Sequence, residues 1–270
     1  MARRSIDRAC SITSVAYGEG TDPFDRFRTF QDAGFTHVHW ADHCWNGAHH
    51  ESEQEIAAIR DACHRHDLKI VDLHGIEASG TDARFTDELW LDANSRRVEL
   101  AAALDADCIV LHPAEMPPEA SEAATFETTV RRLEQLRPVA ERRGIRIAVE
   151  NVYVRPPSAE FLERIFDRFD TSYVGFCFDS GHALMTNRMH LLPTFAERLF
   201  ALHLHDNDGV TDQHRIPGEG SIDWSMVIDA LSTSPYEGPL TLEVIKSPEV
   251  EAAGWCREAF RAIDTLWENR

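Results

Sequence analysis

The sequence predicts an α/β fold, a (β/α)8 or TIM barrel, formed by a single domain over residues 1–270. Two observations predict it. Short apolar segments recur about eight times along the chain, and longer segments with helical periodicity separate them. A length of 270 residues is ordinary for one such barrel, and no linker or low-complexity stretch divides the chain.

The predicted strands are mostly continuous runs of Val, Ile, Leu and Phe, without alternation between apolar and polar residues. Parallel strands that are buried on both faces have this pattern. In chain order the predicted strands are Ser11–Tyr17, His37–Ala41, Lys69–His74, Asp107–His112, Ile145–Glu150, Val174–Asp179, Phe200–His205 and Leu240–Ile245.

The segments between these strands show helical periodicity. The clearest are Glu53–His66, Thr86–Leu104, Phe126–Arg143 and Ser158–Phe169. Ser158 is suited to cap the helix that it opens. Gly34, Gly144 and Gly175 each precede a strand, and we expect them at the C-terminal caps of helices.

The composition restricts the function classes. A formal net charge of -19 repels polyanions, so we do not expect nucleic-acid binding. No apolar run is long enough to cross a bilayer and no apolar signal core follows the basic N-terminus, so we expect a cytoplasmic protein without a membrane partner. The six cysteines form no C-x-x-C pair and are expected to be structural thiols. Homo-oligomerisation stays open.

Polar side chains stand where several predicted strands end. Strand five ends in Glu150, strand six in Asp179 and strand seven near His203, while Glu243 interrupts strand eight. Each could singly be a helix cap or a near-core group, but active sites of barrels form where strands end, so we expect all four at one mouth. Clustered carboxylates repel one another unless a cation neutralises them. Imidazole with carboxylate suits Zn, Mn, Fe or Co better than Ca.

These motifs resemble the xylose isomerase-like barrel superfamily, specifically its sugar phosphate isomerase/epimerase group, which shares its fold with endonuclease IV. The resemblance covers nearly the whole barrel. It is carried by Glu150-Asn151, Phe178–His182, His203–Asn207, Asp212–Trp224 and Glu243.

The resemblance implies one divalent metal ion, preferably Zn or Mn, with Mg, Co or Fe as alternatives. Its implied ligands are Glu150, Asp179, His203 and Glu243. It also implies that Glu150 and Glu243 are the catalytic groups, which move a proton in a sugar, polyol or keto-acid substrate through a metal-stabilised enediolate. The implied activity is that of an isomerase or epimerase.

Further side chains are expected around the substrate. They are His74, His112, His182, His214, Arg215 and Trp45. We expect His203 and His205 to face opposite ways on their strand, so that His203 takes the metal and His205 lies beside it. The sequence does not decide whether His214 or Arg215 reaches the substrate.

The main alternative is a DNA-repair nuclease like endonuclease IV, which uses three zinc ions. The additional metal ligands would then be His74, His112, His182, Asp212 and His214. The net charge and the acidic residues around the loop after strand seven disfavour DNA and favour a small-molecule partner. Enzymes of the hydroxypyruvate isomerase or inosose dehydratase type are a further alternative within the same superfamily.

Overall fold

The computed structural model describes residues 8–17, 23–46, 49, 51–77, 86–114, 120–154 and 158–270. Its parallel strands form one eight-stranded sheet in the order β7-β6-β5-β4-β3-β2-β1-β8. The strands are β1 (Cys10–Thr13), β2 (His37–Trp40), β3 (Lys69–His74), β4 (Cys108–Leu111), β5 (Arg146–Glu150), β6 (Val174–Asp179), β7 (Leu199–His203) and β8 (Leu240–Leu242).

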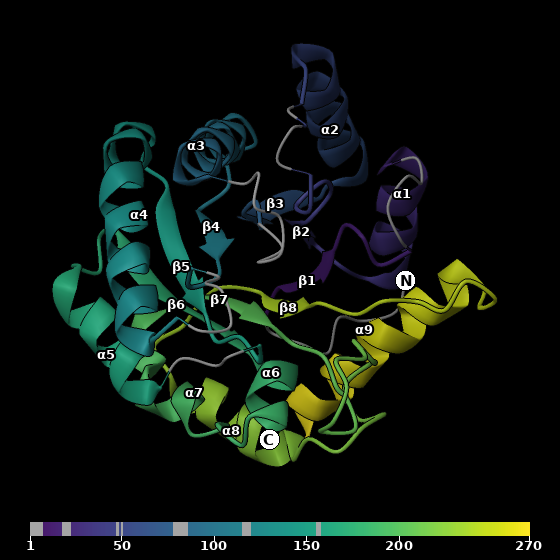
Figure 1. Ribbon diagram of the computed structural model, residues 1–270. Helices are drawn as coiled ribbons and strands as arrows, with labels where there is room; N and C mark the ends of the chain where they lie inside the picture. The colour runs from purple at the N-terminus through teal and green to yellow at the C-terminus, as the bar shows by residue number, and fades with distance from the viewer. Residues whose placement is uncertain are drawn as a thin grey trace.

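The first and last strands in this order, β7 and β8, lie next to each other and close the barrel. The amide of Leu204 donates to the carbonyl of Thr241 at 2.8 Å, and the amide of Glu243 donates to the carbonyl of Leu204 at 3.1 Å. Each parallel strand therefore has a neighbour on both sides, and the predicted barrel is confirmed (Figure 1).

The helices surround the strands on the outside (Figure 1). They are α1 (Pro23–Ala33), α2 (Glu53–His66), α3 (Asp87–Ala103), α4 (Glu122–Arg143), α5 (Ala159–Arg168), α6 (Ser180–Met185), α7 (Leu191–Thr194), α8 (Trp224–Thr233) and α9 (Ala252–Glu268). In the parts of the chain described above, no helix is both long and apolar enough to cross a membrane.

The helix borders follow the local chemistry of the sequence. The hydroxyl of Ser158 accepts from the amide of Phe161 at 3.0 Å, which confirms the predicted cap of α5. Gly144 ends α4 with φ 70, the left-handed conformation that glycine adopts without strain. The expectation for Gly175 is wrong: it lies inside β6, where an added Cβ would overlap the ring of Phe200.

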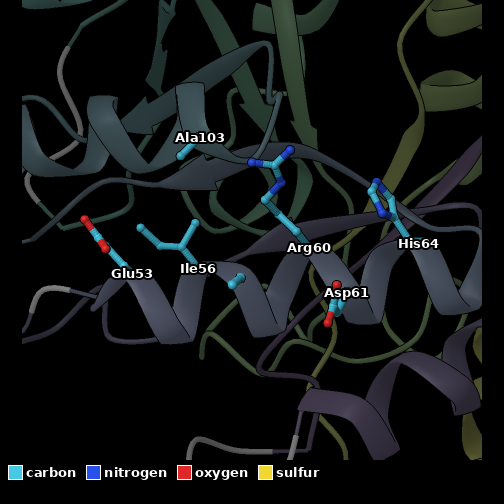
Figure 2. Close-up of a pocket in the computed structure, with 7 residues that line it drawn as sticks. Glu53, Ile56, Arg60, Asp61, His64 and Ala103 are labelled. Carbon is cyan, nitrogen blue, oxygen red and sulfur yellow. The ribbon is translucent and has the colours of Figure 1, made fainter.

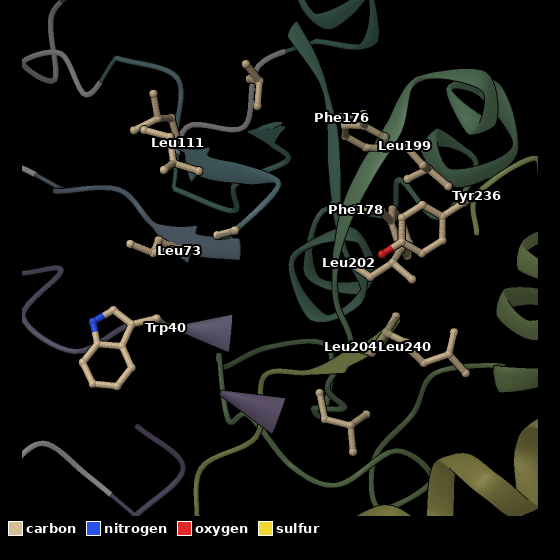
Figure 3. Packing of buried hydrophobic residues seen from close by; sticks show 14 of the residues in the cluster. Trp40, Leu73, Leu111, Phe176, Phe178, Leu199, Leu202, Leu204, Tyr236 and Leu240 are labelled. Atoms are coloured by element: carbon tan, nitrogen blue, oxygen red, sulfur yellow. The ribbon is translucent and has the colours of Figure 1, made fainter. Parts of the chain in front are cut away.

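Side chains alternate between the two faces of the barrel wall. Phe176 and Phe178 of β6, and Leu202 and Leu204 at β7, belong to the large apolar cluster between strands and helices (Figure 3). Residues at the alternate positions face the barrel interior, where a small separate cluster joins Cys108, Val110, Ala148, Cys177 and Ala201. The same alternation directs the polar residue at each strand end into the barrel mouth.

Candidate metal centre

Glu150 stands at the centre of one group of histidines in the mouth. Its carboxylate is 1% exposed. Glu150 Oε2 lies 3.2 Å from His203 Nδ1, 3.5 Å from His112 Nε2 and 3.9 Å from His74 Nε2. His203 Nδ1 also lies 3.4 Å from Glu243 Oε2, so this imidazole stands between the two carboxylates proposed to move protons.

These contacts fit a shared cation better than hydrogen bonds. Glu150 Oε2 and both ring nitrogens of His203 are buried and have no hydrogen-bond partner among the residues that the structure describes. Two ligands at about 2.1 Å from a zinc ion lie about 3–4 Å apart, which matches the separations between these atoms. The donor set of imidazole and carboxylate therefore fits a divalent metal.

Asp179 is the centre of a second group. Its two carboxylate oxygens each lie 3.1 Å from His205 Nε2. His182 joins the two groups, because its Nδ1 lies 3.1 Å from Glu150 Oε1 and 3.5 Å from Asp179 Oδ1. Its Nε2 lies 3.4 Å from Asp212 Oδ2. Asp179 thus meets the Glu150 group through His182.

The expectation that His203 and His205 face opposite ways is wrong. Residues two positions apart on a strand share a face. Leu202 and Leu204 pack outward into the apolar cluster, so His203 and His205 both point into the mouth, and both are 0% exposed. His205, expected only to lie beside the metal ligands, is in direct contact with Asp179.

Gly181 of the Asp-Ser-Gly-His motif allows this approach. A Cβ at Gly181 would overlap the ring of His205. Ser180 fixes the same segment, since its hydroxyl donates to the carbonyl of His205 at 2.7 Å and accepts from the amide of His205 at 2.9 Å. The small residues of the motif therefore set the distance between Asp179 and His205.

The loop between β7 and α8 brings two more donors into the mouth. The ring of His214 stacks on that of His205 at 4.1 Å, and its Nε2 lies 3.2 Å from Asp212 Oδ2. The Nδ1–H of His214 donates to the carbonyl of Glu243 at 2.6 Å. Arg215 is exposed and donates to the carbonyl of Glu219 at 3.3 Å, so His214 is the member of the pair that joins the histidine cluster.

The buried carboxylate of Asp206 holds this loop in shape. Asp206 Oδ2 accepts from the amide of Gly218 at 2.9 Å and from the indole of Trp224 at 2.8 Å. Asp206 Oδ1 accepts from the amides of Asn207 at 2.9 Å and Ile222 at 3.2 Å. Three loop amides and the indole of the first residue of α8 converge on this buried carboxylate, which is 0% exposed.

The pKa values of the buried histidines and of Glu150 are shifted in the direction that favours positive charge in the cluster. Burial lowers the pKa of His112, but the carboxylates of Glu77 and Glu150 outweigh burial and raise it to about 9. Burial likewise lowers the pKa of His214, yet Asp212 and Glu243 raise it to about 9. Burial raises the pKa of Glu150, but the facing histidines hold it well below its usual range. Protons on these histidines balance the carboxylates when no cation does so.

Several residues at the site were not predicted from the sequence. Glu77, which follows β3, lies 3.3 Å from His112 Nδ1. The ring centroid of Tyr153 lies 4.9 Å from that of His182. Trp45, which was predicted, is 63% exposed, and its ring centroid lies 6.4 Å from that of His74. Glu77 stands three positions after His74, a spacing that could have drawn attention to it.

The four predicted ligands, Glu150, Asp179, His203 and Glu243, are distributed over several groups of mutually close donors. Within the described residues, side chains that could hold a metal gather in five overlapping groups. These are His39, His203 and Glu243; His74, Glu150 and His203; His74, Glu77 and His112; Asp179, His182 and His205; and His205, Asp212 and His214. Glu150, His203 and Glu243 lie in two groups that share His203, whereas Asp179 lies in another.

A pocket of about 490 Å³ lies outside the barrel and away from this cluster. Figure 2 shows its lining on α2, with Ala103 of α3 across from Ile56 and Arg60. Its lining residues belong to none of the candidate metal groups, so the mouth is the better candidate site.

Comparisons with known proteins agree with this barrel. The sequence model of a family described as "Xylose isomerase-like TIM barrel" matches residues 27–266. An uncharacterized protein of Sinorhizobium fredii is 32% identical over 157 residues, which cover 54% of this chain and 50% of the relative. The match thus spans half the length of that relative.

Two solved structures are similar in fold. One is described as a D-tagatose 3-epimerase-like protein and has a TM-score of 0.79 at 22% identity, covering 97% of this chain and 98% of that one. The other is an IOLI protein with a binding zinc atom and has a TM-score of 0.82 at 15% identity, with the same coverage. At these identities the likeness concerns the fold.

Proposed function

Since the chain belongs to the xylose isomerase-like TIM-barrel family, we propose that it is a divalent-metal-dependent isomerase or epimerase of a small sugar, polyol or keto-acid. The observation that carries this proposal is the position of His203 between Glu150 and Glu243, at 3.2 Å and 3.4 Å. The carboxylate at the end of β5 and the carboxylate that follows β8 thus face one point in the mouth.

The proposed metal ligands are Glu150, Asp179, His203 and Glu243, and the contact between Asp179 and His205 adds His205 to them. A bound divalent cation would polarise the carbonyl of the substrate and stabilise the negative charge of the enediolate. Zn and Mn suit this donor set, and the zinc atom in the similar IOLI structure favours zinc.

The two glutamates differ in their access to a substrate. The side chain of Glu150 is 1% exposed, whereas that of Glu243 is 13% exposed. We assign Glu243 to remove the proton beside the carbonyl, because it is the carboxylate that reaches the open mouth. Glu150 would return a proton from the other side, and the imidazole of His182, whose Nδ1 lies 3.1 Å from Glu150 Oε1, would supply that proton to the ionised carboxylate. Trp45 would cover the substrate above His74.

A second candidate, a nuclease with several metal ions, is favoured by one observation. The groups around Glu77 and around Asp212 offer donors for more than one cation. Against it stands the formal net charge of -19, which repels a DNA backbone. We therefore rank the small-molecule enzyme first.

Metal content and proton exchange test the proposal. Elemental analysis should find at least one divalent ion per chain in the wild type and less in Glu150→Gln, with exposed Glu141→Gln on α4 as the control. Incubation with ketoses and hydroxypyruvate in D2O should place deuterium beside the carbonyl of at least one. Cleavage of an abasic-site oligonucleotide, with no deuterium exchange across a broad substrate panel, would reverse the ranking.

A further inference from the structure

Beneath the mouth, the barrel interior holds a buried polar pair that the proposed function does not use. His39 of β2 is 0% exposed and Asp72 of β3 is 1% exposed. His39 Nδ1 lies 2.5 Å from Asp72 Oδ1. Such a pair costs free energy to bury unless its remaining polar atoms also find partners.

An irregularity in strand pairing creates this pair. Val38 pairs with Ile70, but the next residue, His39, pairs with Asp72, so that Val71 is left over as a bulge. The bulge brings Asp72 opposite His39, on the interior face. Bulges beside active sites commonly re-aim a side chain in this way.

The second ring nitrogen of His39 faces the proposed centre. Because Asp72 accepts the Nδ1–H, a neutral His39 presents a lone pair at Nε2. This Nε2 has no hydrogen-bond partner in the described parts of the chain and lies 4.0 Å from Glu243 Oε1. The ring of His39 lies 4.6 Å from that of His203. A lone pair that faces a carboxylate is repulsive unless a positive charge lies between them.

We propose that His39, His203 and Glu243 form an inner cation subsite, in which Asp72 orients His39. The donor atoms of the three ligands all lie within 4.8 Å of one another. Tetrahedral ligands at about 2.1 Å from a zinc ion are about 3.4 Å apart, and wider angles bring them to about 4 Å. His203 Nδ1 lies 3.4 Å from Glu243 Oε2, and His39 Nε2 lies 4.0 Å from Glu243 Oε1, so the carboxylate has one oxygen at each of these two separations.

The chemistry of the set agrees with its geometry. A carboxylate that accepts the far N–H of a metal-bound histidine fixes the tautomer and the ring orientation, and Asp72 stands in this position relative to His39. Two imidazoles and one carboxylate leave a coordination position open toward the mouth. This subsite rests on the proposed function, because it requires that the centre bind a divalent cation.

Anomalous diffraction from wild-type crystals grown with Zn²⁺ or Mn²⁺ tests the subsite directly. The expected result is an anomalous peak at about 2.0–2.3 Å from His39 Nε2 that is shared with His203 and Glu243. Ions found only beside Asp179 and His205 would overturn the subsite. This measurement does not depend on whether a variant of a core residue folds.

Solution binding provides the second test. In isothermal titration, Asp72→Asn should bind Zn²⁺ about 10–100-fold more weakly than the wild type, and His39→Gln should bind it at least as weakly as Asp72→Asn. The absorption spectrum of bound Co²⁺ should differ from that of the wild type in both variants. His37→Gln, on the same strand beside Thr36, is the matched control and should keep both properties. Equal affinity and spectra in His39→Gln and wild type refute the subsite alone, whereas a wild type that binds no cation refutes the proposed function.

Discussion

The carboxylate of Asp206 gives the sharpest prediction about how the β7–α8 loop supports the centre. In Asp206→Asn, one of the two oxygens becomes an NH2 group. When the remaining oxygen accepts hydrogen bonds from the amides of Asn207 and Ile222, the new NH2 group takes the place of Oδ2. It then faces the N–H donors of Gly218 and Trp224. Two hydrogen bonds to a buried charge are then lost, and two donors are left facing another donor.

The expected loss of stability follows from these two bonds. Each hydrogen bond to a charged group is worth about 1.5–3 kcal/mol, and partial relaxation of the loop brings the expected total to about 3 kcal/mol. For a domain of this size about 1 kcal/mol shifts the melting temperature by about 2–4 °C, so we expect a decrease of about 6–12 °C. The loop carries Asp212 and His214, so zinc affinity should fall as well.

Thermal unfolding by circular dichroism, together with zinc titration, measures both effects. Trp224→Phe removes one of the four donors and should cause about half of the loss. Asp208→Asn is the matched control in the same loop: its exposed carboxylate accepts from the amides of Val210 and Thr211, and we expect little change. If Asp206→Asn melts at the same temperature as Asp208→Asn, the assignment of Asp206 as the organiser of the loop is wrong.

Three further predictions concern the centre itself. Gly181→Ala should displace the ring of His205 from Asp179 and lower zinc affinity measured by titration, because the added Cβ overlaps that ring. The folded-state pKa values of His112 and His214, about 9, lie above the ordinary value of 6.5, so their protons stabilise the metal-free protein below pH 6.5 and this stabilisation is lost as the pH rises through 9. A divalent cation bound beside these histidines repels their positive charge and lowers their pKa, so zinc binding releases protons and the apparent zinc affinity should rise between pH 6.5 and 9. Removal of bound metal by a chelator should lower the melting temperature, by the equivalent of about 2.7 kcal/mol when free metal had been at 100 times its dissociation constant.

Each of these predictions has a contrary outcome. Unchanged zinc affinity in Gly181→Ala would mean that His205 is not held near the metal. Affinity that is flat from pH 6.5 to 9 would show that neither His112 nor His214 loses a proton on binding. An unchanged melting temperature after chelation would show that the native state gains no stability from metal.

The barrel itself could be predicted from the sequence because its signal is local. Continuous apolar runs such as Val174–Phe178 indicate a strand that is buried on both faces, wherever its neighbours lie. The carboxylates that end β5 and β6, Glu150 and Asp179, could be placed at the mouth for the same reason: all parallel strands end on one side. Strand alternation also determines that His203 and His205 share a face, and the contrary expectation was an error in applying that rule.

The partners of each side chain were decided only by the tertiary structure. The contact between His39 and Asp72 depends on a bulge at Val71, and nothing in the local sequence shows which residue of β3 is left unpaired. The approach of His214 to His205 depends on a loop that four donors fold around Asp206. Register and loop closure are set by hydrogen bonds between residues far apart in the chain, whereas hydrophobic periodicity is set by neighbours. The sequence therefore determined the barrel and which groups stand at its mouth, and the fold decided which of them meet.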